Sequence, residues 1–161
     1  MSNSKRYKFK LIDDEESYKQ AKNLIIEYAD SLKIDLRFQD FKKELKEINI
    51  QYNKPYGGLI IIFDNDSREA IGCIGIRKFE NKIAEFKRMY VKDSHRNKGL
   101  GKELLNRAIQ LAKNLGYEIV RLDTLDTMKY AIALYKKYGF SEIEPYRYNP
   151  QKNVKYFELK L

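Results

Sequence analysis

The stretch that decides the fold is MYVKDSHRNKGLGKELLNRAIQLAKNLG, which runs from Met89 to Gly116. It starts as the end of an apolar strand, continues through a basic turn with two glycines, and becomes a run with leucine and alanine at helical spacing. Gly116 suits the position after a helix end. Glycines between cations at a helix start are typical of sites where backbone N–H groups bind a phosphate. The stretch therefore predicts a strand, an anion-binding turn and a helix in succession.

Composition limits the class of protein and its partners. Of the 161 residues, 43% are hydrophobic, which is enough for one core, so we expect a single domain over residues 1–161. The formal net charge of +9 is compatible with an anionic partner such as nucleic acid, an acidic surface or a phosphorylated cofactor, but the charge alone favours a lysine-rich solvated surface. MSNSKRYKFK at the N-terminus has no apolar signal core, and the longest apolar run, 59–63, is too short to cross a bilayer. We therefore expect a cytoplasmic protein without membrane contact.

The single cysteine and the single histidine exclude several kinds of site. Cys73 alone can form neither an intramolecular disulfide nor a thiolate metal site, and we expect no metal. His95 alone confines any Ser-His-Asp triad to the glycine turn. Because its neighbours Arg96 and Lys98 disfavour an imidazolium there, we expect His95 to be an exposed turn residue.

The periodicity of apolar residues predicts the order of the elements. Alternation predicts strands near residue 7 and at 59–63, 70–77, 83–91, 119–122 and 154–161. Helical spacing predicts helices after an N-cap at Asp13 or Asp14, around 38–48, at 100–115 and at 128–138. This order favours an α/β (α+β) domain with one mixed sheet, antiparallel at first and with a parallel crossover at the glycine turn.

Three glycine-rich phosphate motifs compete for that turn. A Walker A loop fails because Arg96 and Glu103 stand where it needs a glycine and a hydroxyl residue, and a dinucleotide fingerprint fails because Leu104 replaces its third glycine. The remaining motif is R-x-x-G-x-G at 96–101. Its backbone N–H groups are the unpaired donors of a helix N-terminus, where the helix dipole favours an anion. On its own this motif also fits a capped surface turn.

The residues around the motif occur in an informative order. EFKRMYV at 85–91 is followed by R-x-x-G-x-G, by LDT at 122–124 and by ALYKKYGF at 133–140. This combination resembles the GNAT superfamily of acyl-CoA-dependent N-acetyltransferases, over essentially the whole chain from about Tyr7 to Leu161. FQDF at 38–41, PYGG at 55–58 and YRYNP at 146–150 resemble one bacterial branch whose substrates are mostly unassigned. The resemblance implies a mixed central sheet of about six to seven strands flanked by about four helices.

The resemblance also implies acetyl-CoA as co-substrate and a set of residues that bind it. The pyrophosphate is expected on the main chain of the turn, at Arg96, Asn97, Lys98, Gly99, Leu100, Gly101 and Lys102. In the family the fourth strand parts from the fifth, and its backbone, here at Met89, Tyr90 and Val91, pairs with the pantetheine arm and polarises the thioester carbonyl. Met128 stands where many members have an asparagine that holds the pantetheine amide, so Thr124 or Thr127 is expected to replace that contact.

Acyl transfer also needs a proton donor for the thiolate and a neutral amine. The resemblance places Tyr135 as the general acid, and a phenol can protonate a thiolate of comparable basicity; core packing is the alternative role. Glu85 stands where some members carry the carboxylate that takes the amine proton, and a structural pairing with Arg88 or with a neighbouring strand fits equally well. Asp123 is a second candidate base, or a cap for the following helix.

In the family the acceptor enters opposite coenzyme A, over the first two helices and the loop before the last strand. The candidate substrate-binding residues on these segments are Tyr28, Arg37, Phe38, Tyr146 and Tyr148. Aromatic walls with one cation suit a small amine that also bears a carboxylate, which Arg37 would bind through both guanidinium nitrogens.

Two other functions remain open at this stage. The charge, and tyrosines interleaved with lysines, fit a nucleic-acid-binding module, although the aromatic pair of an RNA-recognition fold is missing from the sequence, so nucleic acid is the less favoured partner. A non-catalytic acyl-CoA sensor is the other alternative. A homodimer is compatible with the sequence, which does not decide the oligomeric state.

Overall fold

The computed structural model describes residues 3–33, 35–36 and 40–161. Its helices are α1 (Asn3–Arg6), α2 (Glu15–Leu32), α3 (Phe41–Lys46), α4 (Ile48–Gln51), the short 3-10 helix η2 (Asp93–His95), α5 (Leu100–Asn114) and α6 (Lys129–Lys137). Its strands are β1 (Tyr7–Leu11), β2 (Gly58–Asp64), β3 (Ala70–Glu80), β4 (Ile83–Val91), β5 (Ile119–Leu125), β6 (Ser141–Ile143) and β7 (Val154–Lys160).

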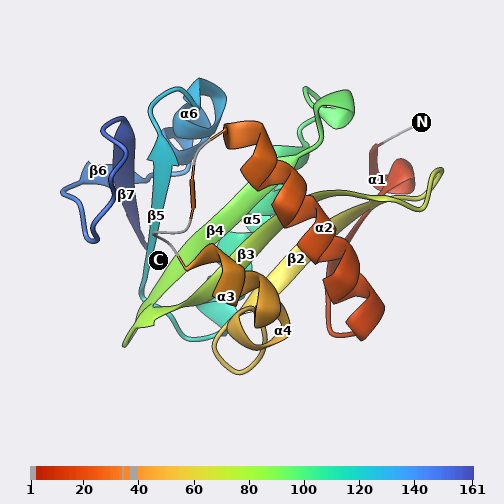
Figure 1. Cartoon of the computed structure of the whole chain (residues 1–161), viewed down its shortest axis with the longest axis horizontal. Helices are drawn as coiled ribbons and strands as arrows, with labels where there is room; N and C mark the ends of the chain where they lie inside the picture. Colours follow the sequence, from red (N-terminus) through yellow and green to blue (C-terminus); the bar gives the residue numbers. More distant parts are fainter. Residues whose placement is uncertain (1–2, 34, 37–39) are drawn as a thin grey trace.

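The strands form one seven-stranded mixed sheet in the order β1-β2-β3-β4-β5-β7-β6 (Figure 1). Neighbouring strands are antiparallel except β4 and β5, which are parallel and are joined through α5. The predicted α/β class and the parallel crossover at the glycine turn are therefore confirmed. Every helix among the described residues is too short or too polar to span a membrane.

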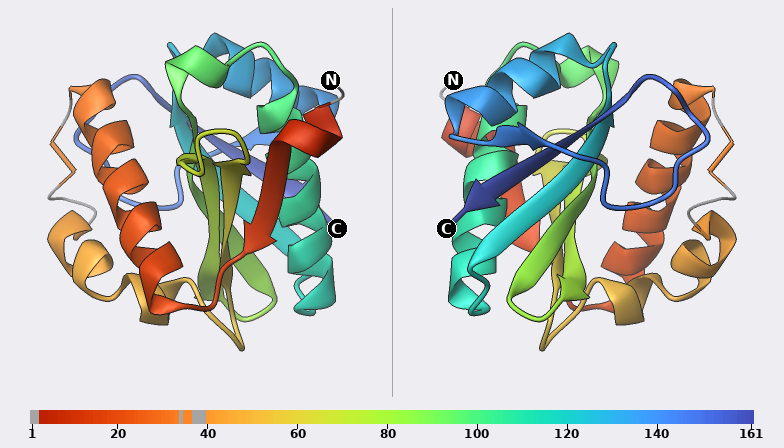
Figure 2. Two further views of the ribbon diagram at one scale, coloured as in Figure 1. Left: turned by 90° about the vertical axis from the view of Figure 1, so that its right-hand side faces the viewer. Right: turned by 90° about the vertical axis from the view of Figure 1, so that its left-hand side faces the viewer.

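Two hydrophobic cores lie on the two faces of the sheet. The run LIIIF at 59–63 in β2 is apolar throughout because Leu59 and Ile61 pack in one core while Ile60 and Ile62 pack in the other. The first core lies under α2 and α4, and the second under α5 and α6. Figure 2 shows α2 and α5 on opposite sides of the sheet. We call these the α2 face and the α5 face.

Most predicted elements are present, with differences at their ends. Asp14 caps α2 as predicted, since its side chain accepts a hydrogen bond of 2.8 Å from the Ser17 N–H. The helix expected around 38–48 is two short helices, α3 and α4, which meet at Glu47; Phe38 lies outside the described residues. Short α1 has no counterpart in the sequence-based prediction, and β3 continues three residues beyond Arg77 because the β3–β4 hairpin turns at 81–82.

A β-bulge in β4 sets the geometry next to the glycine turn. Cys73 pairs with Tyr90 and Gly75 pairs with Lys87, so Arg88 and Met89 together face one residue of β3. Arg88 has a φ of 61°, in the left-handed region that residues other than glycine rarely adopt. Its guanidinium donates two hydrogen bonds of 2.9 Å to the buried Glu44, which holds this conformation in place. Beyond the bulge, the alternation of side chains along β4 is shifted.

The parallel strands β4 and β5 part soon after they begin. Within the described chain they pair only from Ile83 to Glu85, opposite Ile119 to Arg121, while β5 continues to pair with β7 along its other edge. Figure 1 shows the two strands diverging toward the end where α5 and α6 begin. The bulge lies in the part of β4 that has left β5, so backbone groups of 86–91 face the gap. This gap is what positions the candidate site.

Candidate active site

A large cleft opens where the two strands diverge. Its volume is about 580 Å³. It lies between the last turn of α2, the end of β4, the glycine turn and the start of α6. The residues that line it are Tyr28, Ser31, Leu32, Met89, Tyr90, Val91, Asp93, His95, Arg96, Asn97, Gly99, Leu100, Gly101, Thr127, Met128, Lys129, Tyr130 and Ala131. The structure thus brings together most of the residues predicted to bind coenzyme A.

The glycine turn presents its backbone to this cleft. Asn97 and Gly99 have φ angles of 62° and 75°, and Gly99 caps α5 without a side-chain hydrogen bond. A Cβ on Gly101 would approach no atom closer than 4.0 Å, so the space beside it is open. The start of α5 thus lines the cleft at two glycines, and the N–H groups of a first helical turn suit a bound anion.

Of the charged residues of the turn, Arg96 lines the cleft but its guanidinium is bound by other groups, and the two lysines lie outside the cleft. The Arg96 guanidinium donates to the Val91 carbonyl at 3.0 Å and pairs with Asp93 at 2.8 Å. Lys98 donates to the Tyr7 hydroxyl at 3.3 Å, and neither Lys98 nor Lys102 lines the cleft. The backbone, rather than these lysines, is the part of the turn that faces the cleft.

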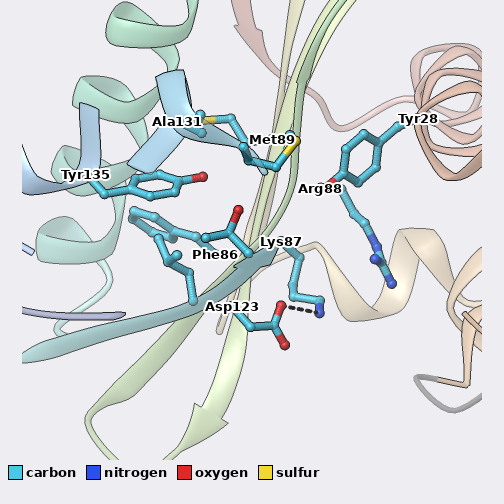
Figure 3. A pocket seen from close by; sticks show the side chains of 11 residues that line it. Tyr28, Phe86, Lys87, Arg88, Met89, Asp123, Ala131 and Tyr135 are labelled. Atoms are coloured by element: carbon cyan, nitrogen blue, oxygen red, sulfur yellow. Dashed lines mark ion pairs between the residues drawn. The ribbon is translucent and has the colours of Figure 1, made fainter. Parts of the chain in front are cut away.

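A smaller cavity of about 40 Å³ continues the cleft into the gap between β4 and β5 (Figure 3). It shares four residues with the cleft: Tyr28, Met89, Met128 and Ala131. Its remaining walls are Phe86, Lys87, Arg88, Leu122, Asp123, Thr124 and Tyr135. Thr124 thus lies in the small cavity and Thr127 in the large cleft, which makes Thr127 the better placed of the two for the contact that Met128 cannot make.

Tyr135 lies on the α5 face of the gap. Its ring packs in the core, with centroids 5.6 Å from Phe140 and 6.2 Å from Phe157, and the residue is 6% exposed. Figure 3 shows its hydroxyl pointing into the small cavity. Burial raises the pKa of Tyr135, with further increases from Tyr28 and Asp123, so the phenol stays protonated at neutral pH. Packing of the ring and exposure of the hydroxyl to the cavity are compatible.

Glu85 is bound by other side chains and lines neither cavity. Its carboxylate is 1% exposed; it pairs with Arg77 at 3.1 Å and with Arg147, and it accepts a hydrogen bond of 2.9 Å from the Tyr146 hydroxyl. Burial alone would raise the pKa of Glu85, but Lys87, Arg147 and Arg77 outweigh it and lower the pKa to about 2. A carboxylate this acidic and this enclosed is a poor proton acceptor, so the geometry favours its structural role. Of the two partners suggested by the sequence, Arg88 and a neighbouring strand, the second is present: Arg77 on β3 pairs with Glu85, and Arg147 adds a further partner.

The predicted acceptor residues are only partly brought together. Tyr28 lines both cavities, and its ring lies 5.5 Å from that of Tyr90. Tyr146 instead packs edge-on against Phe79 and Tyr156, and Tyr148 is 80% exposed. Neither of these two lines the cleft or the small cavity. Arg37 and Phe38 lie outside the described residues.

Lys87 is the site residue that the sequence reasoning missed. Its ammonium is buried on the α2 face and lies 3.7 Å from a carboxylate oxygen of Asp123 across the gap. Burial lowers the pKa of Lys87 to about 8, although Asp123 opposes this shift. Asp123 does not cap α6, whose N-cap is Met128. The available signal was a lysine between Glu85 and Arg88 in a strand whose other residues are apolar or aromatic.

His95 is not the exposed turn residue that was expected. Its side chain is 13% exposed, and Nε2 lies 3.1 Å from the buried Asp64. The short helix η2 turns the ring back onto the sheet, where it packs edge-on against Tyr7. His95 therefore ties the glycine turn to β1 and β2.

Comparison with known proteins identifies the family. Residues 21–140 match the acetyltransferase (GNAT) family. The chain belongs to the GNAT family of acetyltransferases. An N-acetyltransferase of Schizosaccharomyces pombe is 38% identical over 141 residues, which are 87% of this chain and 86% of the relative. This GNAT chain is accordingly an acyltransferase.

Solved GNAT structures show the same fold. A GNAT acetyltransferase of Staphylococcus aureus superposes with a TM-score of 0.78 at 22% identity, over 96% of this chain and 98% of the other. A second, from Elizabethkingia anophelis, was solved with acetyl-CoA bound and has a TM-score of 0.55 at 24% identity, over 65% and 76% of the two chains. The predicted GNAT fold is confirmed.

Proposed function

We propose that this GNAT enzyme transfers the acetyl group of acetyl-CoA to the primary amine of a small molecule, by direct attack of the amine in a ternary complex. The observation that carries the proposal is the gap between β4 and β5, which joins the cleft at the start of α5 to a small polar cavity. One opening thus offers an anion-binding backbone at one end and titratable groups at the other.

The cleft fits acetyl-CoA in its chemistry. The open space beside Gly101 and the unpaired N–H groups at the start of α5 suit a pyrophosphate. The free edge of β4 at Met89, Tyr90 and Val91 suits an extended amide chain, which adds to a strand edge through backbone hydrogen bonds. The structure with acetyl-CoA bound in the Elizabethkingia anophelis relative supports the same co-substrate here.

Tyr135 is assigned as the proton donor. In the reaction the amine nitrogen attacks the thioester carbon, the new N–C bond forms, and the C–S bond breaks. The departing sulfur takes a proton from the Tyr135 hydroxyl, which is protonated at neutral pH and faces the cavity. The acceptor enters as an ammonium ion and loses two protons overall, one to replace that of Tyr135 and one to solvent.

Glu85 is assigned to the frame of the site and not to proton transfer. It joins β3 and β4 to the segment before β7 through Arg77, Arg147 and Tyr146. A buried carboxylate with three partners holds these segments in one arrangement, which in turn fixes the lower end of the gap.

The acceptor is proposed to be an amino acid or a related amine with a carboxylate. Ion pairs join two sets of side chains, of which Lys87, Arg88 and Asp123 line the small cavity and the others lie behind it. They carry four cations, Arg77, Lys87, Arg88 and Arg147, and three carboxylates, Glu44, Glu85 and Asp123. Four minus three leaves one positive charge among these described residues, which favours an anionic group on the acceptor over a polycation.

A panel of amine acceptors tests this function through the release of free thiol from acetyl-CoA. Amino acids and small carboxylated amines are expected to give higher kcat/KM than spermidine or lysine-rich peptides. If polyamines or basic peptides are the best acceptors, the acceptor class is wrong while acetyl transfer stands. If no amine releases thiol above the rate with water, the proposed function itself is wrong.

A further inference from the structure

The side chains around the gap are divided between the two faces of the sheet. On β5, Val120 and Leu122 pack in the core of the α5 face, so the alternation along the strand sends Asp123 to the α2 face. On β4, Phe86 packs in the same core as these residues, so Lys87 also points to the α2 face. Tyr135 reaches the gap from α6 on the other face. A proton donor for sulfur and a carboxylate thus lie on opposite sides of one opening.

Asp123 has a hydrogen-bonding capacity that its neighbours leave unused. Its side chain is 10% exposed, and one carboxylate oxygen, Oδ1, lies 3.7 Å from the Lys87 ammonium. The other oxygen, Oδ2, is buried and receives no hydrogen bond from any residue that the structure describes. A buried carboxylate oxygen without a donor is costly and rare in a folded protein, and such groups mark sites that bind a ligand.

The cavity that Asp123 helps to line has the size of a small polar group. Its volume of about 40 Å³ accommodates roughly three water-sized groups. That is enough for an ammonium group and its first carbon atom, and too little for an aromatic ring. Apolar walls from Phe86, Leu122 and Met89 exclude bulk water on the α5 face, and so strengthen the attraction between a carboxylate and a cation.

We propose that Asp123 and Lys87 form the acceptor-amine subsite. Oδ2 of Asp123 binds the ammonium group of the acceptor and takes one of its protons, and Lys87 positions the carboxylate. The proposal rests on the proposed acetyl transfer and names the group that activates its nucleophile. The acceptor approaches from the α2 face, Asp123 accepts one proton from the R–NH3+ group, and the resulting R–NH2 faces the gap. The second proton leaves the nitrogen after the N–C bond has formed.

Lys87 is a positioning residue in this scheme, because it acts through Asp123. Its ammonium lies 3.7 Å from Oδ1 and attracts that side of the carboxylate, which leaves Oδ2 for the acceptor. The other charged groups around Lys87 are Glu85 and Arg88 on β4 and Arg77 on β3. Lys87→Met removes the charge beside Oδ1 while filling a similar space. We expect it to raise the KM for the amine more than it lowers kcat, since the Asp123 carboxylate is then no longer held in position, and we expect Lys87→Arg, which keeps the charge, to restore part of the loss.

The decisive experiment uses methylamine, the smallest alkyl ammonium, as acceptor in the thiol-release assay with full-length enzyme. Asp123→Asn keeps the shape of the side chain but replaces the basic carboxylate with a neutral amide, which does not take a proton from the amine. We therefore expect kcat/KM at pH 7.5 to fall about 100-fold or more. The loss is expected to shrink steadily as the pH rises toward the pKa of free methylamine, because the amine then arrives already neutral. Acetyl-CoA affinity, measured by calorimetry, is expected to remain within about twofold.

The matched control is Asp126→Asn at the end of the same strand, where the carboxylate contacts Asn153 and lines neither cavity. It is expected to behave as the wild type. Asp123→Asn with wild-type kcat/KM, or with a loss that is equal at all pH values, overturns the subsite while acetyl transfer stands. Wild-type enzyme that releases no thiol with methylamine or any amine of the panel overturns the proposed function, and the subsite with it.

Discussion

At the scale of single residues, Tyr135 combines two environments. Its ring is held between Phe140 and Phe157, while its hydroxyl faces the small cavity between β4 and β5. Burial raises the pKa of the phenol, so it carries its proton throughout the physiological pH range. The same packing of the ring fixes the direction in which the hydroxyl points.

Tyr135→Phe is expected to lower kcat by roughly 10- to 1000-fold, because the thiolate then leaves without a proton donor. The ring packing is kept, so the melting temperature and the affinity for acetyl-CoA are expected to change little. Tyr138→Phe, on the same helix with its hydroxyl 3.5 Å from the Lys102 carbonyl, is the matched control. Wild-type kcat in the Tyr135 variant would assign that residue to core packing alone.

At the scale of elements, β4 links the core to the site through its charged residues. Glu85 has a pKa of about 2 in the folded protein and 4.5 as a free side chain. Because the pKa of Glu85 is lower in the folded protein than in the unfolded chain, ionised Glu85 stabilises the folded protein. This contribution is fully present above about pH 4.5 and is lost as the pH falls toward 2. The difference corresponds to roughly 3 kcal/mol at neutral pH.

Glu85→Gln is therefore expected to lower the free energy of unfolding by roughly 3 kcal/mol at pH 7. At pH 3 the difference from the wild type is expected to be smaller, because Glu85 then binds a proton in the unfolded chain but remains largely ionised in the folded protein, which offsets part of its stabilising contribution. Urea unfolding at the two pH values measures both. Glu142→Gln, which removes a half-exposed pair with Lys155, is expected to change stability by less than about 1 kcal/mol. A stable Glu85→Gln enzyme with a large loss of kcat would instead restore Glu85 as the catalytic base.

Elements with a strong local pattern were predictable from the sequence, and the contacts between distant ones were not. The N-cap at Asp14, the helix after the glycine turn and the alternating strand before it follow from spacing that a single element determines. The bulge at Arg88 is held by Glu44, which is 44 residues away in the sequence, so no local sequence pattern predicts it. That bulge decides which face Met89 and Tyr90 occupy.

At the scale of the whole molecule, the site is the place where four elements end or begin. The cleft lies between the end of α2, the end of β4 and the starts of α5 and α6. The backbone part of this site was predictable because the glycine turn is contiguous in sequence. The partners of Glu85, the burial of Lys87 and the pairing of His95 with Asp64 each join segments far apart in the chain, so composition and spacing do not reveal them.

The most direct test of this account is a calorimetric titration of acetyl-CoA into the wild type, Gly101→Asp and Asn106→Asp. The space beside Gly101 is open, so an aspartate there leaves α5 intact but places a carboxylate on the anion-binding surface, whereas Asn106 lies on the exposed side of the same helix. We predict binding to the wild type and to Asn106→Asp with the same affinity, and no measurable binding to a folded Gly101→Asp. Unchanged affinity in folded Gly101→Asp would contradict the assignment of the cleft to acetyl-CoA.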